Sequence, residues 1–413
     1  MNPKKILFIS YDGMTDPLGQ SQVIPYLAGL TKYGYRFTIL SCEKPARFIE
    51  KNKDYVLSLL AAYPIEWVPI MYHKNPPVLS SIYDFNHLKN KAKQLHKKHS
   101  FDLVHTRVGV PQLLGLWIKK NLGIKFLNDI RGFWADERVD GGMWDIKNPV
   151  YKTVYNFFKK KEDEFIIYAD YNVCLTYAAR REIHTWRQIP HQPIPVEVIP
   201  CCVDMNLFDP YYIDATLKKQ FKEELKISDD DIIISYLGSI GGWYLIDEMM
   251  RFCKAVSDKI PAAKFLFISP HLHDTIAAAA GKYGLSPDKL IVKQGKRHEV
   301  PVLLSFSNYS VFFIKPCYSK ISSSPTKHGE IMAMGIPVIS NRGIGDVDEI
   351  ITKYNSGYLV DDFSDAAFNE VADKIVTGDS FNKKDIRAGA KDFYSLDLAV
   401  ERYRNVYAKI FAE

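Results

Sequence analysis

The sequence lacks the features of a membrane-spanning or disulfide-stabilised protein. No run approaches the ~20 consecutive apolar residues that a transmembrane helix requires, and the opening MNPKKILFIS has no signal-peptide pattern. The six cysteines form no C-x-x-C pair, and the adjacent Cys201 and Cys202 suit neither a metal site nor a mutual disulfide. We therefore expect a cytoplasmic protein with reduced, mostly buried thiols.

Nucleic acid is also disfavoured as a partner, because the basic clusters lack regularly interleaved aromatic residues. Charge is divided unevenly: residues 1–200 hold 28 Lys and Arg against 19 Asp and Glu, although the whole chain carries only +6. Some of the basic side chains of this half form clusters, such as Lys89, Lys91, Lys93, Lys97 and Lys98, and the run Lys159, Lys160 and Lys161. Each cluster suits an anionic membrane surface or an anionic acceptor, or simply forms a solvated helix face.

A chain of 413 residues is long enough for two domains of roughly 200 residues each. Short β-branched or apolar runs alternate with longer helical patterns, which is typical of βα units and parallel sheets covered on both faces. The runs that predict strands are 6–10, 37–41, 102–105, 125–128, 172–175 and 196–199, and then 232–237, 264–269, 290–293, 310–314 and 336–340. The predicted fold class is α/β, with two Rossmann-like doubly wound parallel sheets facing each other across a cleft.

A domain boundary is predicted where the run at Val196 ends in Pro200, with a hinge near residues 200–210. We expect an N-terminal domain over residues 1–205 and a C-terminal domain over residues 206–390. The last segment, residues 391–413, has an amphipathic helical pattern and is predicted to pack back on the N-terminal domain.

One helix start has the form of an anion-binding site, within SSSPTKHGEIMAMGIPVIS at residues 322–340. Ser324 is a good N-cap and Pro325 is favoured at the first helical position, so a helix is predicted from Pro325 to about Met334, ended by Gly335.

The first turn of that helix carries the candidate chemistry. The free N–H groups of Thr326 and Lys327 point out of the positive helix end, where phosphate oxygens are favoured, and Lys327 adds a full charge. Glu330 lies three residues further on the same face, where a carboxylate can accept two hydrogen bonds from a ribose diol. The alternative is an ordinary capped helix with Lys327 and Glu330 as a surface pair.

Two glycine-containing loops add to this signal. In YLGSIGGWY, residues 236–244, Gly238, Gly241 and Gly242 permit a ligand to approach the backbone closely. The spacing is not G-x-G-x-x-G, so NAD is a weak interpretation, and a tight turn without a ligand is the alternative. The first strand feeds YDGMTDPLGQSQ, with Gly19 just before a helical pattern. If these loops converge on one cleft, a diphosphate held from both sides accounts for them.

In their order along the chain, these loops resemble the GT-B glycosyltransferases, and within them the retaining family-four group, also called glycosyl transferases group 1. The segments that carry the resemblance are FDLVHTRVGVP, DIRGFWADE, ADYNVCLT, the hinge over residues 198–208, YLGSIGGWY and PTKHGEIMAMGIPVISNRGIGDVDEI. The resemblance implies that the C-terminal domain binds the nucleotide, that the N-terminal domain binds the acceptor, and that catalysis needs no metal or other cofactor.

By position, Glu330 matches the ribose-binding carboxylate, and Lys327 and the amide of Gly19 match diphosphate contacts. Lys327 and Glu330 are thus the catalytic candidates. The other residues expected at the donor are Gly238, Ser239, Arg297 and Thr326, of which Arg297 lies in a loop resembling the one beside the base. The acceptor-binding candidates are Asp129, Arg131 and Glu137, for which a salt-bridged loop is the alternative.

This chain departs from the family pattern at four places, one of which is the hinge, where Cys201-Cys202 stands instead of Asn-Gly. The first carboxylate of the family's E-x₇-E motif is replaced by Ser322. A basic pair that is common after the glycine loop is replaced by Ser239 and Tyr244, and Lys327 supplies the charge instead. Where many relatives carry a His near the acceptor, this chain has Asp129-Ile130-Arg131.

The expected function is transfer of a sugar from a UDP- or GDP-type donor to a glycan or polyprenyl-linked glycan, with retention, in surface polysaccharide or lipopolysaccharide biosynthesis. The basic first half is compatible with peripheral contact at the inner membrane face. The alternatives are a nucleotide-sugar 2-epimerase on the same fold and a non-catalytic two-domain ligand-binding protein.

Overall fold

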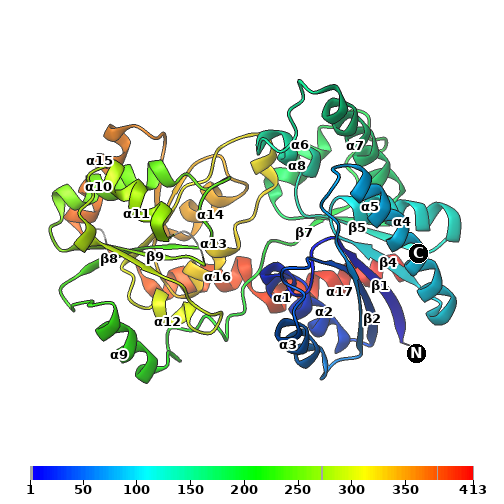
Figure 1. Ribbon diagram of the computed structural model, residues 1–413, viewed down its shortest axis with the longest axis horizontal. Helices are drawn as coiled ribbons and strands as arrows, with labels where there is room; N and C mark the ends of the chain where they lie inside the picture. The colour runs from blue at the N-terminus through cyan, green and yellow to red at the C-terminus, as the bar shows by residue number, and fades with distance from the viewer. Residues whose placement is uncertain (1–2, 271–272, 379, 413) are drawn as a thin grey trace. The chain divides into compact units, whose positions relative to one another are not determined.

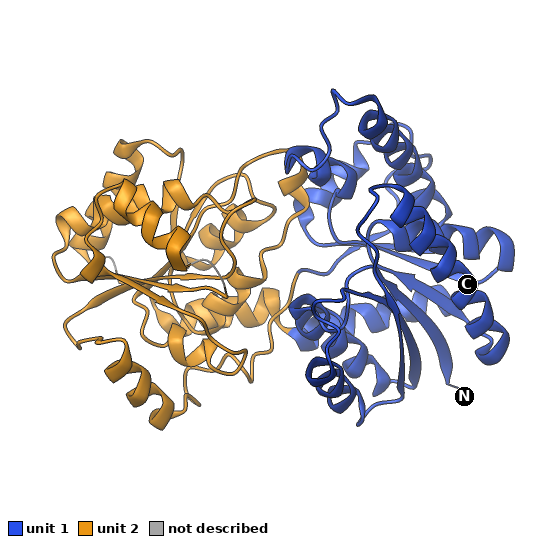
Figure 2. Cartoon of the chain, in the orientation of Figure 1, with its two compact units in different colours: residues 1–200, 396–413 blue, residues 201–395 orange. Residues whose placement is uncertain are grey.

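The computed structural model of the chain describes residues 3–270, 273–378 and 380–412. It divides into two compact units, coloured separately in Figure 2. Unit 1 contains the chain up to Pro200 together with the segment from Leu396 onward, and unit 2 contains Cys201–Ser395. The chain therefore leaves unit 1 at Pro200 and returns to it at Leu396, whereas the sequence placed these changes at residues 205 and 390.

Unit 1 is built on a parallel sheet with helices packed against it (Figure 1). Within its described residues the sheet has seven strands in the order β3-β2-β1-β4-β5-β6-β7. The strands are β1 (Lys4–Ser10), β2 (Tyr35–Glu43), β3 (Ile65–Met71), β4 (Leu103–Thr106), β5 (Lys125–Ile130), β6 (Tyr171–Cys174) and β7 (Val196–Val198). The helices are α1 (Pro17–Gln22), α2 (Ile24–Thr31), α3 (Glu50–Leu60), α4 (Leu79–His99), α5 (Val110–Leu122), α6 (Trp134–Asp140), α7 (Pro149–Tyr168), α8 (Tyr177–His184) and α17 (Leu396–Ala412).

Unit 2 repeats this plan with a six-stranded parallel sheet over its described residues, in the order β10-β9-β8-β11-β12-β13. The strands are β8 (Ile232–Leu237), β9 (Ala263–Ile268), β10 (Leu290–Lys293), β11 (Tyr309–Phe312), β12 (Val338–Asn341) and β13 (Gly357–Val360). The helices are α9 (Ala215–Glu224), α10 (Ile246–Lys259), α11 (His273–Lys282), α12 (Val300–Leu304), α13 (Thr326–Ala333), α14 (Val347–Tyr354), α15 (Asp365–Thr377) and α16 (Lys383–Tyr394), with 3₁₀ turns η1 (Pro287–Lys289) and η2 (Tyr318–Ser322).

The central strands read as near-continuous apolar runs because helices cover both faces of each sheet. In β8, for example, every residue from Ile233 to Leu237 is buried. The predicted α/β class with a doubly wound parallel sheet in each half is confirmed. Two edge strands, β3 and β13, were not predicted, since β3 contains Pro69 and is only partly buried, and β13 alternates between partly buried and buried residues.

The order of strands reverses between β1 and β4 in unit 1 and between β8 and β11 in unit 2. Ligands of open parallel sheets bind beyond the carboxyl ends of the strands at such a switch point. In unit 2, this position is occupied by the loop after β8, which begins at Gly238, and by the segment that leads from β11 to α13.

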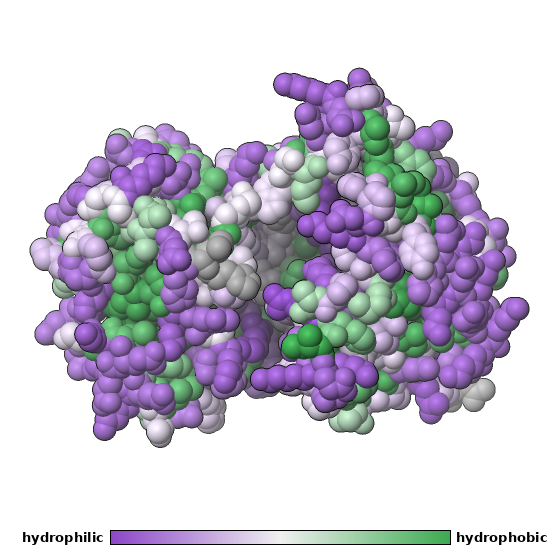
Figure 3. Space-filling view, in the orientation of Figure 1, coloured by the Kyte–Doolittle hydropathy of each residue, from purple (hydrophilic) through white to green (hydrophobic). Residues whose placement is uncertain are grey.

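Helix α17 returns to unit 1 and packs on α2. Its buried face consists of Ala399, Val400, Tyr403, Val406, Tyr407 and Ile410. Gly29 of α2 permits the contact, because a Cβ at this position would lie 2.5 Å from a methyl carbon of Val400. The surface drawn in Figure 3 is mostly hydrophilic and is interrupted by smaller hydrophobic areas in each unit.

Candidate functional site

The loop after β8 brings backbone against a lysine side chain. Gly238 has a φ of +118°, a conformation that favours glycine, and its N–H donates to the carbonyl of Ile268 at 2.9 Å. A Cβ at Gly238 would lie 2.9 Å from Nζ of Lys327. Two predicted donor residues therefore meet, but the Gly238 amide is used by the sheet, so the contribution of this residue is to let Lys327 approach.

Helix α13 begins one residue later than predicted and has a different cap. The structure places Pro325 at the N-cap, with no side-chain hydrogen bond to the first turn. The expected cap, Ser324, is wrong, because its hydroxyl instead accepts a hydrogen bond from the N–H of Cys201 at 3.1 Å. Thr326 and Lys327 thus form the first turn of a helix whose positive end has no side-chain cap, which is the geometry that favours an anion.

Lys327 is buried among aromatic rings. The residue is only 7% exposed, and Nζ donates to the hydroxyl of Tyr236 at 3.1 Å. Nζ also lies 3.6 Å from the ring centroid of Tyr244 and 4.3 Å from that of Tyr236. Burial lowers the pKa of Lys327 well below its usual value, although the charge of Glu330 opposes this shift. Within the part of the chain that the structure describes, Lys327 forms no salt bridge.

Glu330 lies on the same helix and is paired with Arg297. The Glu330 side chain is 7% exposed, and its Oε1 accepts from Nη1 of Arg297. The Arg297 guanidinium is partly exposed and lies 4.8 Å from the ring centroid of Phe208. The structure thus brings these two predicted donor residues together. A carboxylate has about four acceptor positions, so Glu330 can face a ribose diol while Arg297 fixes its orientation.

Ser239 and Thr326 complete the predicted donor residues of unit 2. Ser239 is exposed, and its carbonyl accepts from the hydroxyl of Tyr236. Tyr236 therefore links the ammonium of Lys327 to the backbone of the glycine loop. The sequence prediction did not include Tyr236 or assign a role to Tyr244, although both flank the glycines in YLGSIGGWY.

Gly19 lies in unit 1 and is part of α1, not of a loop as predicted. It packs on the turn after β1, because a Cβ at Gly19 would lie 2.4 Å from the carbonyl oxygen of Gly13. This turn is held by Glu43, the last residue of β2, which is fully buried and accepts from the N–H of Met14 at 2.8 Å and of Thr15 at 3.1 Å. Glu43 was not among the predicted residues, although an acidic residue two positions after the apolar run 37–41 was the available signal.

The acceptor candidates lie at the carboxyl end of β5 in unit 1. Asp129 is 2% exposed, and its Oδ2 accepts from the hydroxyl of Tyr403 at 2.9 Å and lies 3.4 Å from His105 Nε2 and 3.9 Å from Arg131 Nη1. Glu137 belongs to α6, and its Oε1 would lie 3.2 Å from a Cβ at Gly132. The structure thus groups Asp129 and Arg131 beneath α17 and places Glu137 beside the same loop.

Electrostatics favour the charged form of Asp129. Burial alone raises the pKa of this carboxyl, but the Arg131 guanidinium and the His105 contact outweigh burial, and the pKa falls below its usual value. Burial lowers the pKa of His105 more than Asp129 raises it, so the imidazole is neutral at pH 7. Asp129 is therefore an internal anion that holds Arg131 and α17, rather than a group presented to solvent.

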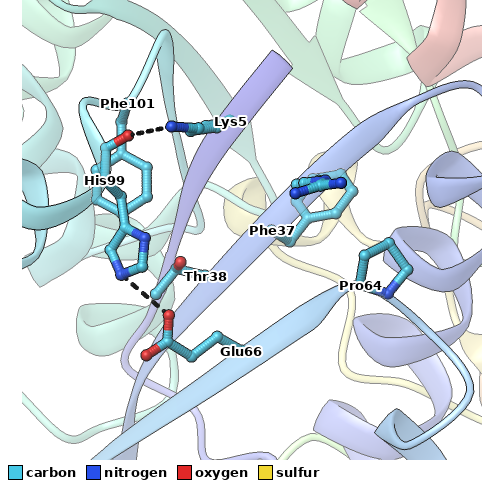
Figure 4. Close-up of a pocket in the computed structure, with 8 residues that line it drawn as sticks. Lys5, Phe37, Thr38, Pro64, Glu66, His99 and Phe101 are labelled. Carbon is cyan, nitrogen blue, oxygen red and sulfur yellow. Dashed lines mark hydrogen bonds and ion pairs between the residues drawn. The ribbon is translucent and has the colours of Figure 1, made fainter. Parts of the chain in front are cut away.

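A pocket of about 370 Å³ in unit 1 lies away from these residues (Figure 4). Lys5 and Glu66 line it together with His99, and Figure 4 shows that Lys5 donates to the carbonyl of His99. These side chains come from the amino-terminal parts of β1 and β3 and the end of α4. Ligands of parallel sheets bind beyond the carboxyl ends of the strands, whereas this pocket lies at their amino ends, so we do not place the reaction in it.

Among residues 3–270, 273–378 and 380–412, no three His, Cys, Asp or Glu side chains are grouped so that they could hold a metal ion. Over the same residues, no helix is both long and apolar enough to cross a membrane.

Two family models match the chain in succession. One is described as Glycosyltransferase Family 4 and matches residues 20–207, and the other is described as Glycosyl transferases group 1 and matches residues 218–392. The chain belongs to the GT-B glycosyltransferases. It is an enzyme that uses a nucleotide-sugar donor, which sets aside the non-catalytic binding protein considered above. A comparison with curated protein sequences gives no significant match.

Solved structures share the whole fold. A glycosyltransferase from Rickettsia africae ESF-5 has a TM-score of 0.73 and 16% identity, with 100% of this chain and 99% of that chain covered. HepE from Anabaena, in complex with UDP and glucose, has a TM-score of 0.70 and 13% identity, with 98% and 99% covered. WaaG, a glycosyltransferase involved in lipopolysaccharide biosynthesis, has a TM-score of 0.67 and 13% identity, with 96% and 98% covered. At these identities the likenesses establish the GT-B fold.

Proposed function

We propose that the first turn of α13 and the loop after β8 bind the diphosphate of a UDP- or GDP-type sugar donor. The observation that carries this proposal is Lys327, a buried ammonium that lies against Gly238 and forms no salt bridge within the described residues. A buried cation is costly unless an anion balances it, and a diphosphate supplies that anion. The crystallisation of HepE with UDP and glucose supports a UDP-type donor.

The chemistry follows from where charge develops. As the glycosidic bond to the diphosphate breaks, the sugar becomes oxocarbenium-like and negative charge grows on the departing phosphate oxygens. Lys327 and the free amides of the first turn, including that of Thr326, are fixed beforehand at this place, and such preorganised donors typically stabilise a transition state by several kcal/mol. Glu330, oriented by Arg297, is proposed to accept hydrogen bonds from the ribose diol. Contact of the Gly19 amide with the diphosphate stays a prediction.

For the acceptor side, we propose that the loop after β5 binds a glycan or polyprenyl-linked glycan hydroxyl, with Arg131 and Glu137 near the acceptor and Asp129 holding Arg131 in place. The acceptor hydroxyl attacks the sugar from the face that the diphosphate leaves, so no protein nucleophile is needed. The departing diphosphate takes the proton of that hydroxyl. This route gives retention of configuration without a metal. The role of WaaG in lipopolysaccharide biosynthesis supports an acceptor of surface polysaccharides, and the lysine clusters of unit 1 suit peripheral contact with an anionic membrane.

The donor site is tested by two substitutions and one control. Lys327→Ala and Glu330→Ala are each expected to lower kcat/KM at least tenfold, roughly 1.4 kcal/mol or more, while circular dichroism shows that the fold persists. Glu370→Ala is the matched control, because Glu370 is an exposed carboxylate that pairs with Lys374 on α15 and is expected to leave the rate unchanged. Wild-type turnover by Lys327→Ala or Glu330→Ala would remove that residue from the site.

The donor is identified by thermal shift against UDP, GDP and their sugars, since a ligand at 100 times its Kd stabilises by about 2.7 kcal/mol. Incubation with donor alone separates transfer from 2-epimerisation, because an epimerase forms a new nucleotide sugar without an acceptor. The anomeric proton coupling of the product tests retention. EDTA is expected to leave the rate unchanged, and loss of activity that Mg²⁺ or Mn²⁺ restores would contradict the metal-free mechanism.

A further inference from the structure

The ammonium of Lys327 is held by two tyrosines on separate parts of unit 2. Tyr236 belongs to β8, and its hydroxyl accepts from Nζ at 3.1 Å while donating to the carbonyl of Ser239. Tyr244 follows the glycines, and its ring centroid lies 3.6 Å from Nζ. Gly238 lies against the same ammonium. The charge is therefore enclosed by ring faces, one hydroxyl and glycine backbone.

A buried lysine in a folded protein ordinarily faces a carboxylate. Here the acidic residue on the same helix, Glu330, is paired with Arg297 instead. Ring faces attract a cation through their quadrupole but carry no net charge, so they hold an ammonium without neutralising it. A carboxylate in the place of Tyr244 would hold the lysine equally well but would repel an incoming diphosphate.

We propose that Tyr236 and Tyr244 form an aromatic clamp that positions Lys327 and leaves its charge available for the donor diphosphate. The proposal rests on the function proposed above and adds to it two positioning residues. It also explains why Tyr244 stands where a basic residue usually follows this glycine loop. Tyr244 does not bind the phosphate itself but positions Lys327, the cation that does.

The clamp has a consequence for protons. Burial lowers the pKa of Lys327, while burial raises the pKa of both Tyr236 and Tyr244, which stay neutral. The charge that acts on Lys327 is that of Glu330, whose partner is Arg297, and the Cys201 thiol lies near Tyr244. A bound diphosphate favours the ammonium form. At a pH above the lowered pKa of Lys327, donor binding therefore takes up a proton. At a pH below that pKa, the lysine is already charged and binding takes up none.

The test is titration calorimetry of full-length protein with UDP and with GDP, in two buffers of different ionisation enthalpy. Tyr244→Leu removes the ring and is expected to weaken binding about fivefold to thirtyfold, with greater proton uptake, since the neutral lysine is then favoured. Tyr244→Phe keeps the ring and is expected to bind with wild-type affinity. Tyr283→Leu is the matched control, because the Tyr283 ring centroid lies 4.8 Å from Nζ of another lysine, Lys282, elsewhere in unit 2.

Lys327→Met separates failure of the clamp from failure of the site. If wild type and Lys327→Met bind UDP and GDP equally, or if wild type binds neither, the proposed diphosphate site is wrong. If Lys327→Met weakens binding but Tyr244→Leu binds and takes up protons like wild type, only the clamp is refuted. Should Tyr244→Leu fail to fold, Tyr236→Phe decides: about twofold to tenfold weaker binding supports the clamp, and unchanged binding overturns it.

Discussion

Replacing Asp129 with Asn is expected to destabilise unit 1 while leaving donor binding unchanged. The substitution keeps the shape of the side chain, which is 3% exposed, but removes its charge, which faces Arg131, His105 and Tyr403. The side chain of Arg131 is itself only 4% exposed. Removing one partner of a buried ion pair typically costs about 3–5 kcal/mol.

This free energy corresponds to a large thermal shift. For a unit of roughly 200 residues, each kcal/mol lowers Tm by about 2–4 °C, so the expected loss is roughly 6–20 °C at neutral pH. Differential scanning calorimetry of wild type and Asp129→Asn measures it. Asp102→Asn is the control, because Asp102 is partly exposed and pairs with Lys4 at 3.6 Å, a surface contact worth about 1 kcal/mol at most.

The difference between wild type and Asp129→Asn also depends on pH. The pKa of Asp129 is lowered in the folded state, so its contribution to stability is present above the unfolded pKa of about 3.9 and is lost as pH falls through the folded value. The gap in Tm is therefore expected to shrink only in acid, below about pH 4. Equal Tm values at pH 7 would refute the role of the buried charge. A loss of UDP or GDP affinity like that of Lys327→Ala would instead place Asp129 at the donor.

Two further substitutions test contacts that hold functional segments. The Glu43 carboxylate accepts hydrogen bonds from the N–H and the hydroxyl of Thr15, and Glu43→Gln brings an amide donor to the same place. This substitution is expected to lower the free energy of unfolding in urea by about 1–3 kcal/mol. An unchanged urea midpoint would contradict it. Arg387→Lys keeps the charge but loses the guanidinium, which donates to Asp209 at 2.8 Å and to the Ala333 carbonyl at the end of α13. This substitution is expected to lower the Tm of unit 2 and to leave the transfer rate unchanged below that Tm. A wild-type melting curve would show that the two guanidinium contacts are dispensable.

The sequence predicts central elements better than edges and contacts. Central strand β8 matches its predicted range to the residue, because a buried parallel strand reads as a continuous apolar run. Edge strand β3 escapes this pattern, since Pro69 and its half-buried side chains are tolerated only where one side of the strand lacks a neighbour. Periodicity thus reports burial, and it weakens where burial is incomplete.

Within the candidate site, local motifs were readable and long-range partners were not. The first turn of α13 follows from Pro325 and the residues after it. The cap was wrong because Ser324 is engaged by Cys201, which is more than 100 residues away in the chain. The pairing of Glu330 with Arg297 and the tyrosines around Lys327 depend equally on which strands lie side by side, and spacing along the sequence carries no such information.

The return of α17 to unit 1 has a consequence for the making of the protein. A ribosome completes β1 to β7 long before it adds Tyr403 and Tyr407, the residues that cover Asp129 and His105. During that interval all of unit 2 is synthesised, while a charged carboxylate and the α2 surface at Gly29 remain open to water. A messenger RNA that stops before Leu396 would thus encode a complete unit 2 joined to an N-terminal unit whose buried polar network stays open to water.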